Sequence, residues 1–272
     1  GIRDIGVTGV QTCALPICLS VFNFRNHHQV DVEPDSSCNA FVGDNGTGKT
    51  NMLDAIHYLA MCKSYFNPID SQNIRYQEDS CMIQGAFSIE GREEVVSCAL
   101  RRQQKKLFRR NAKEYDRLSD HIGFIPLVMI APTDTQLITE GSDERRRFLD
   151  SIIAQFNPVY LDDLVNYNRL LSQRNALLKS ASLNGRVDSG MLDIFDEQLV
   201  PLAQAIHAVR HEFVAKLVPA FQASYSFITG NKEETGMEYI SSLHETGMAD
   251  LLRTSRVRDL AAQFTTGGVH KD

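Results

Sequence analysis

The sequence predicts an α/β protein built around a phosphate-binding loop, and three observations lead to this prediction. Residues 43–50, Gly-Asp-Asn-Gly-Thr-Gly-Lys-Thr, match the pattern G-x-x-x-x-G-K-[ST], which cradles phosphates. Short runs of strand-forming residues lie on both sides of this loop. Residues 160–213 then carry apolar side chains at helical spacing, interrupted by a loop that contains Gly and Ser. Together these features predict strands on both sides of the loop helix, followed by an antiparallel helical hairpin.

The composition is typical of a soluble globular protein. Of the 272 residues, 43% are hydrophobic and 23% are charged, and the chain is long enough for one large domain or two modest ones. A formal net charge of -6 means that any nucleic-acid-binding surface has to be local. The six cysteines include no C-x-x-C pair, which favours reduced thiols in a cytoplasmic protein over a zinc site or a disulfide framework. No apolar run is long enough to span a membrane.

The first residues of the chain fit no element. Residues 1–17 lack the basic and apolar regions of a signal peptide, and they show no sustained helical or strand periodicity. The string resembles a translated sequencing adapter, and a disordered natural tail is the alternative. We therefore treat residues 1–18 as a separate segment and expect the natural start of the protein to be missing.

Three strands are expected before the end of the phosphate-binding loop. Residues 19–24 alternate between two faces, residues 30–32 supply a second strand, and residues 38–42 read as a short buried strand that enters the loop. After the loop, apolar residues recur at helical spacing from Met52 to Ala60, so a helix begins where the loop ends.

The loop residues have predicted roles. Gly43, Gly46 and Gly48 let the backbone turn with its N–H groups inward, and the helix N-terminus adds partial positive charge. Lys49 is expected to reach the β- and γ-phosphates of ATP, and the hydroxyl of Thr50 to ligate Mg²⁺. A glycine-rich turn that binds no nucleotide is the alternative.

A basic stretch follows two further strands, predicted at residues 81–89 and 95–100. It contains seven cations and no acidic residue, and a turn at 111–112 suggests a second hairpin. Uncompensated positive charge in an acidic protein suits contact with a DNA backbone, whereas a solvated edge protected by charge is the other reading. The seven candidates are Arg101, Arg102, Lys105, Lys106, Arg109, Arg110 and Lys113.

The second half of the chain is mainly helical. A helix is expected from residues 141–142 to 156, with Arg145, Arg146 and Arg147 on a solvated face. Helices over 160–179 and 192–213 form an antiparallel arm, with a kink at Pro201. We expect strands at 224–228 and 237–241 that return to the sheet, and a helix over 248–262.

Several motifs now resemble those of the RecF family, the bacterial recombination mediators. They occur in family order from residue 19 to residue 272: Asn-Phe-Arg-Asn (23–26), the loop with its flanks (41–51), Leu-Asp-Ala-Ile (53–56), Arg-Arg-Phe-Leu-Asp (146–150), a Tyr…Gln-Arg-Asn helix (167–175), and Gly-Val-His-Lys-Asp (268–272). The last of these has valine where the family has proline.

The resemblance implies an α/β fold of the P-loop NTPase class, an ABC/SMC-type ATPase head with a mixed sheet around the loop helix and a helical-hairpin lobe. It also implies ATP and Mg²⁺ as cofactors. In such proteins ATP joins two heads into a homodimer on DNA and slow, DNA-stimulated hydrolysis releases them. The family binds DNA at gaps in recombinational repair, replication and the SOS response, and helps to load RecA, with RecO and RecR as partners. The implied nucleotide-binding residues are Arg25, Asn26, Gly43, Asp44, Asn45, Gly46, Thr47, Gly48, Lys49, Thr50 and Asn51.

The domain organisation follows from the same comparison. We expect the initial segment 1–18, a head lobe with the phosphate-binding loop at 19–140, a helical arm or lobe at 141–222, and a return to the head at 223–272. The family's signature Ser-Gln-Gly-Gln and its acidic Walker B strand have no match, so the catalytic residues are unknown. We therefore expect a fragment that is poorly soluble, binds nucleotide weakly if at all, and hydrolyses no ATP.

Three other readings stay open. An SMC-like chromosome or repair ATPase would share the fold but normally carries a far longer coiled coil. A P-loop kinase of small molecules would not explain the Asn-Phe-Arg stretch or the arm. A DNA clamp that binds ATP without turnover is compatible with the sequence.

Overall fold

The computed structural model describes residues 9–12, 14–184 and 189–272, and the chain divides into two compact units. The first unit ends at Ile138 and the second begins at Thr139. Each unit has its own core, and the units are described separately below.

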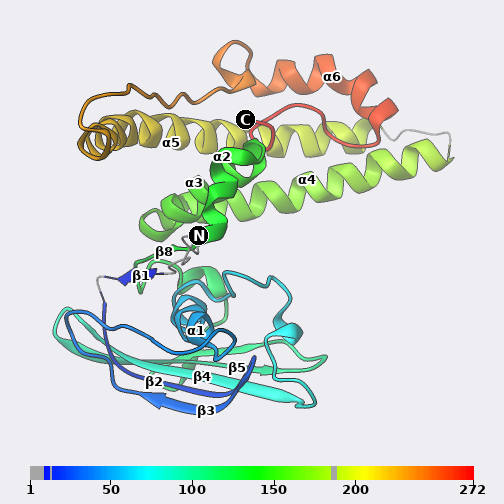
Figure 1. Ribbon diagram of the computed structural model, residues 1–272. Coiled ribbons are helices and arrows are strands. Elements are labelled where there is room, and N and C mark those ends of the chain that lie inside the picture. Colours follow the sequence, from blue (N-terminus) through cyan, green and yellow to red (C-terminus); the bar gives the residue numbers. More distant parts are fainter. Residues whose placement is uncertain (1–8, 13, 185–188) are drawn as a thin grey trace. The chain divides into compact units, whose positions relative to one another are not determined.

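The first unit holds two antiparallel sheets (Figure 1). The larger sheet has the strand order β3-β2-β4-β5-β6-β7, and the smaller one pairs β1 with β8. Their bounds are β1 Gly9–Thr12, β2 Leu15–Phe24, β3 His27–Val32, β4 Ser80–Ile89, β5 Arg92–Arg101, β6 Leu107–Arg110, β7 Lys113–Glu114 and β8 Leu127–Ile130. Short turns of 3-10 helix lie at Asp70–Gln72, Leu118–Asp120 and Pro132–Thr135, and the helix α2 covers Gln136–Thr139.

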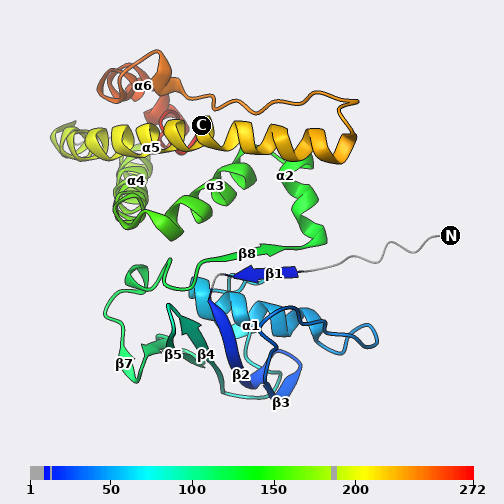
Figure 2. The same cartoon turned by 90° about the vertical axis from the view of Figure 1, so that its left-hand side faces the viewer.

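Helix α1, Lys49–Met61, lies between the larger sheet and the β1–β8 pair (Figures 1 and 2). One face of the larger sheet is buried beneath it, because alternate residues of β4 and β5 such as Ile83 and Cys98 point towards the helix. A side chain at Gly85 would place its Cβ 2.8 Å from Leu59 Cδ1. The glycine therefore allows α1 to pack directly on the sheet.

Two strand predictions are wrong in the first unit. The first long strand begins at Leu15 rather than Leu19, because Leu15 and Pro16 already pair with Ser88 and Phe87 of β4. Backbone pairing depends little on side chains, which is why the sequence pattern missed this extension. The prediction of an adapter-derived segment stays untested, and residues 1–8 lie outside the described part of the chain.

The expected buried strand at residues 38–42 is also absent. Among the described residues no strand pairs with this segment, and Val42 is 88% exposed. Asp35 and Asn39 instead close a local turn, in which Asp35 N donates to Asn39 Oδ1 at 2.8 Å. All pairings of the described strands are antiparallel, so the parallel pairing of a mixed sheet is not seen in this part of the protein.

The second unit is helical. Helices α4 and α5 form the predicted antiparallel hairpin, and α6 packs on both of them (Figure 1). The bounds are α3 Ser142–Phe156, α4 Pro158–Asn184, α5 Ser189–Thr229 and α6 Met248–Ala262, with a 3-10 turn at Ser242–His244. The predicted helices at 142–156 and 248–262 are thus confirmed.

The two strands expected at 224–228 and 237–241 are wrong. Helix α5 continues through Pro201 and Pro219 to Thr229, a length of about 60 Å at 1.5 Å per residue. Residues 230–241 then run back along α5 as irregular chain (Figures 1 and 2). Residues 223–272 consequently lie in the second compact unit instead of adding strands to the sheet.

Two buried arginines, which we call the arginine clamps, tie the second unit together. Arg174 donates to Asp196 at 2.7 Å and to Asp259 at 2.8 Å. Arg210 donates to both oxygens of Asp150 at 3.0 Å and to the Val269 carbonyl at 2.6 Å. Each clamp therefore joins segments that lie far apart in the sequence.

Two kinds of feature are absent from the described residues. No helix there combines the length and the apolar composition needed to cross a membrane. No group of three or more His, Cys, Asp or Glu side chains in the same residues is arranged to hold a metal ion.

Candidate nucleotide-binding site

The phosphate-binding loop leads directly into the N-terminus of α1. Gly43, Gly46 and Gly48 have φ angles of 148°, 86° and 100°, a region that other residues rarely adopt. Helix α1 starts at Lys49, with Gly48 as its N-cap. In the described structure the backbone N–H groups of Gly46, Gly48, Lys49 and Thr50 donate no hydrogen bond. The loop thus presents donors at the positive end of a helix dipole, as an anion site requires.

The two polar side chains at the start of α1 are placed for phosphate and metal chemistry. The ammonium group of Lys49 folds over the loop and donates to the carbonyls of Gly43 at 2.8 Å and Asp44 at 2.7 Å. Thr47 Oγ1 also donates to the Asp44 carbonyl, at 2.9 Å. The exposed hydroxyl of Thr50 has no hydrogen-bond partner among the described residues. The loop therefore carries one cation and one unpaired hydroxyl on its open side.

The turn between β2 and β3 is fastened to this loop. Asn26 Nδ2 donates to the Gly46 carbonyl at 3.2 Å, and Asn51 Nδ2 donates to Asn26 Oδ1 at 2.7 Å. His27 Nε2 lies 3.1 Å from the Gly48 carbonyl. A Cβ at Gly48 would come within 2.4 Å of that histidine nitrogen. Glycine is therefore needed at position 48 both for its backbone angle and for the close approach of the turn.

Arg25 lies in the same turn and is held by α1. Its guanidinium forms an ion pair with Asp54 at 2.7 Å and donates to Ser64 Oγ at 2.7 Å and to Asn51 Oδ1 at 3.3 Å. The Asp54 side chain is fully buried, and its other oxygen accepts from the backbone N–H of Tyr65 at 2.7 Å. The carboxylate thus fixes a cation beside the loop at a position that leaves 19% of the arginine side chain exposed.

A cavity of about 760 Å³ lies beside this turn. Arg25 and Asn26 line it on the side of the phosphate-binding loop, and Ile74, Arg75 and Tyr76 line it elsewhere. The Tyr76 side chain is 84% exposed and so has an open aromatic face. The cavity is therefore connected to the loop through the β2–β3 turn, because Asn26 both lines the cavity and bonds the Gly46 carbonyl.

The structure separates the seven cations of the basic stretch into two groups. Arg110 makes two bonds to Glu94, at 2.8 and 2.9 Å, and Lys106 pairs with Asp70 at 3.0 Å. Arg102 donates to the Glu78 carbonyl at 2.9 Å. The other four are exposed and make no ion pair or side-chain hydrogen bond within the described structure: Arg101, Lys105, Arg109 and Lys113.

Sequence reasoning missed three residues of the site, namely His27, Asp54 and Ser64. His27 follows the Asn-Phe-Arg-Asn stretch directly, so its place beside the loop could have been inferred from that neighbourhood. Asp54 carries a signal of its own, because it is an acidic residue at a buried position of an otherwise apolar helix face. Nothing in the sequence distinguishes Ser64 as a partner of Arg25 and Asp54.

Comparison with known proteins agrees with this architecture. Residues 18–208 match the AAA domain family. The DNA replication and repair protein RecF of Parabacteroides distasonis is 48% identical over 254 residues, and that of Phocaeicola vulgatus is 46% identical over 255 residues. In both cases the match covers 93% of this chain and 68% of the relative.

A solved structure supports the same assignment. It is the recombination mediator protein RecF in complex with ATP, from the RecFOR pathway. It superposes with a TM-score of 0.85 at 25% identity, covering 94% of this chain and 71% of the other. The resemblance inferred from the motifs is confirmed, and with it the P-loop ATPase fold. The chain belongs to the RecF family of DNA replication and repair proteins.

Proposed function

We propose that the chain binds ATP with Mg²⁺ at the phosphate-binding loop and uses this binding to control contact with DNA. The observation that carries the proposal is the loop itself, in which unpaired N–H groups, Lys49 and Thr50 all lie at the N-terminus of α1. The solved relative binds ATP by its description, and the fold matches over most of this chain.

In this proposal the triphosphate is held by residues 43–51. Lys49 leaves the carbonyls of Gly43 and Asp44 and contacts the β- and γ-phosphates, which gives the ammonium a charged acceptor in place of two neutral ones. The Thr50 hydroxyl ligates Mg²⁺, a hard cation that prefers oxygen ligands. Asn26 and Asn51 stabilise the loop through their shared hydrogen bond.

The nucleoside half belongs in the adjoining cavity. Its volume of about 760 Å³ leaves room for a ribose and a base, and Asn26, which lines the cavity and bonds the Gly46 carbonyl, connects it to the phosphate-binding loop. Arg25 contributes positive charge between the two halves, and Asp54 keeps the guanidinium in place. Tyr76 offers a ring on which a base can stack.

The DNA contact is assigned to the basic hairpin, which we define as residues 101–113 from the end of β5 through β6 to β7. Of the seven cations in the basic stretch, Arg101, Lys105, Arg109 and Lys113 make no ion pair or side-chain hydrogen bond within the described structure, so these four are the candidates for phosphate contacts. Lys106, Arg110 and Arg102 are instead bonded to Asp70, Glu94 and the Glu78 carbonyl, respectively.

The cellular role follows from family membership. We infer action at DNA gaps in the cytoplasm during recombinational repair and replication, with ATP-dependent pairing of two copies. RecO and RecR are the expected partners and RecA loading the expected outcome. The relatives named for DNA replication and repair, and the structure assigned to the RecFOR pathway, support this inference.

A binding experiment tests the proposal. Lys49→Ala is expected to weaken the affinity for a fluorescent ATP analogue at least about tenfold, because the variant has no ammonium to donate to the phosphates. Thr50→Ala should reduce only the gain in affinity that Mg²⁺ provides. Lys216→Ala, an exposed helix position, is the matched control. Equal ATP affinity in the parent and in Lys49→Ala would contradict the proposal.

A further inference from the structure

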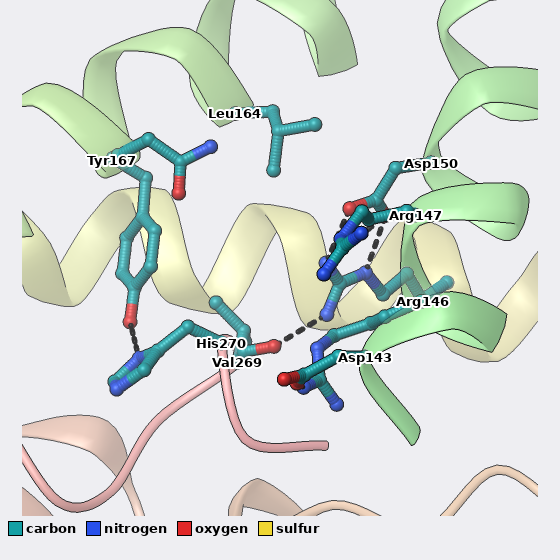
Figure 3. Close-up of a pocket in the computed structure, with 10 residues that line it drawn as sticks. Asp143, Arg146, Arg147, Asp150, Leu164, Tyr167, Val269 and His270 are labelled. Carbon is teal, nitrogen blue, oxygen red and sulfur yellow. Dashed lines mark hydrogen bonds and ion pairs between the residues drawn. The ribbon is translucent and has the colours of Figure 1, made fainter. Parts of the chain in front are cut away.

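The second unit contains a polar cavity that the proposed nucleotide site does not use. Its volume is about 260 Å³, larger than the ~150 Å³ that suffices for a benzene molecule. Figure 3 shows that α3, α4 and the last residues of the chain surround it. Three segments that resemble RecF motifs, at 146–150, 167–175 and 268–272, therefore meet at one place.

The floor of this cavity is fixed. Arg210 is 2% exposed and is held by Asp150, by the Val269 carbonyl and by Asp272, whose carboxylate lies at 3.5 Å. Tyr167 donates its hydroxyl hydrogen to His270 Nδ1 at 2.9 Å, and His270 Nε2 donates to the Thr265 carbonyl at 3.0 Å. Each of these polar groups already has a hydrogen-bond partner. The floor therefore limits the size of a ligand but offers it no free hydrogen-bond donor.

The rim of the cavity, formed by Arg146 and Arg147 of α3, differs from the floor because the ion pairs of these arginines are weak. Arg146 exposes only 10% of its side chain, yet its partner on the same helix, Asp143, is 72% exposed. Arg147 pairs with Glu144 at 2.7 Å while remaining 70% exposed. Ion pairs of this exposed kind, three residues apart on one helix, contribute at most about 1 kcal/mol. An anion of higher charge can therefore displace either carboxylate.

A third donor faces the arginines from α4. The side chain of Asn168 lines the cavity and has no hydrogen-bond partner among the described residues. Both oxygens of Asp150 are already used by Arg210 and Tyr160, so this carboxylate offers little to a cation. The lining holds three arginines and two aspartates, and of these arginines Arg210 is the one enclosed by the largely buried carboxylates of Asp150 and Asp272. The first turn of α3 adds the positive end of its dipole.

We propose that this cavity binds a phosphate group, held by Arg146 and Arg147 of α3 and by Asn168 of α4. Phosphate matches this donor set, because its several oxygens accept from two guanidinium forks and one amide at once. The phosphate can come from a free phosphate compound or from a nucleic-acid backbone. The assignment is independent of the ATP site, since none of these residues lies in the first unit.

The backbone conformation of Gly268 allows the final loop, residues 265–272, to pass close to α4. Gly268 has φ of 123°, and a Cβ there would lie 2.8 Å from the hydroxyl oxygen of Tyr167. The glycine therefore lets the loop pass against α4 and sets His270 at the floor. Burial lowers the pKa of His270, so the ring is neutral near pH 7 and keeps both hydrogen bonds.

An NMR titration tests the proposal in protein carrying Lys49→Ala, so that the phosphate-binding loop does not contribute. Inorganic phosphate and a short oligothymidylate are added separately at constant ionic strength. The side-chain amide signals of Asn168 and the Nε–H signals of Arg146 and Arg147 are expected to shift and saturate. The Arg146→Ala/Arg147→Ala double variant should bind at least about tenfold more weakly.

Two further variants make the result decisive. Arg145→Ala removes a neighbouring cation that does not line the cavity and should leave the affinity unchanged. Asn168→Asp, at an exposed position that tolerates substitution, should weaken binding by repulsion. Saturation by oligothymidylate alone would assign the phosphate to a nucleic-acid backbone, and saturation by inorganic phosphate to a free compound. Unmoved Asn168 signals, or equal affinity in the double variant and Arg145→Ala, would overturn the proposal.

Discussion

The phosphate-binding loop of the first unit and the arginine clamps of the second unit are held in place by different kinds of interaction. The loop is exposed, and its bonds to Asn26 and His27 run between neutral groups. The clamps are buried, and each guanidinium binds carboxylates from distant segments. A site that must admit a charged ligand keeps its donors free, whereas a clamp directs its charge to carboxylates of the same unit. The loop should therefore govern binding and the clamps should govern stability.

The largest expected effect comes from removing a clamp. Arg174→Met leaves the fully buried Asp259 without its cation, which should lower the free energy of unfolding by about 3–5 kcal/mol. Lys216→Ala removes an exposed pair on α5 and should cost less than about 1 kcal/mol. Urea unfolding followed by circular dichroism measures both. Similar midpoints for the two variants would mean that the clamp does not stabilise the second unit.

The core of the first unit contains a buried histidine, His121, and its burial predicts a pH effect. Burial lowers the pKa of His121 to about 4, while its ring bonds the Leu59 carbonyl at 2.7 Å. Below pH 6.5, the usual pKa of histidine, the imidazole of His121 takes up a proton in the unfolded chain but stays neutral in the folded chain. Stability is therefore complete above about pH 6.5 and falls as the pH approaches 4, by about 3 kcal/mol.

His57 adds to this acid sensitivity, since burial lowers its pKa to about 4 as well. The measurement is the free energy of unfolding between pH 7 and pH 4 for the parent, His121→Gln and the exposed-site control His28→Gln. Of these two variants, His121→Gln should reduce the dependence of the unfolding free energy on pH, and His28→Gln should leave it unchanged. A parent-like slope in His121→Gln would remove this histidine from the explanation.

A smaller effect separates two glycines of the loop. Gly48→Ala adds a Cβ 2.4 Å from His27 at a φ of 100°, so it should cost about 2 kcal/mol and also weaken ATP binding. Gly46→Ala meets no atom within 4 Å, so only the backbone strain of about 1 kcal/mol remains. Thermal unfolding and ATP titration compare the two. Equal effects of the two substitutions would show that contact with the β2–β3 turn is unimportant.

The smallest effect concerns the free cations of the basic hairpin. Replacing Arg101, Lys105, Arg109 and Lys113 with Ala should reduce the slope of log K against log salt by about 0.7–0.9 for each DNA phosphate that the variant no longer neutralises. The fold should be unaffected, because these side chains make no internal ion pair in the described structure. Lys216→Ala serves again as the control. If the slope is unchanged, the hairpin is a solvated edge.

The same contrast explains what could be predicted from the sequence. The loop and the start of its helix are contiguous in the sequence, and their spacing and residue types carry the chemistry, so they were predicted. Arg25 was predicted only through the family resemblance of residues 23–26. The clamps join residues that are 22 to 85 positions apart and each partner alone looks like a surface charge. The end of α5 was misread because Ser224 to Ile228 has strand-forming residues but packs as helix. Residues 38–42 were misread because their apolar pattern implied a partner strand.

Amide hydrogen exchange with and without ATP and Mg²⁺ tests the central claim most directly. The N–H groups of Gly46, Gly48, Lys49 and Thr50 have no acceptor in the described structure, so they should exchange rapidly in the free protein. Bound phosphates should slow this exchange strongly, together with that of the 25–27 turn, while Lys49→Ala should show little change. Unaltered exchange across residues 43–51 at saturating ATP would contradict the claim that these donors cradle the nucleotide.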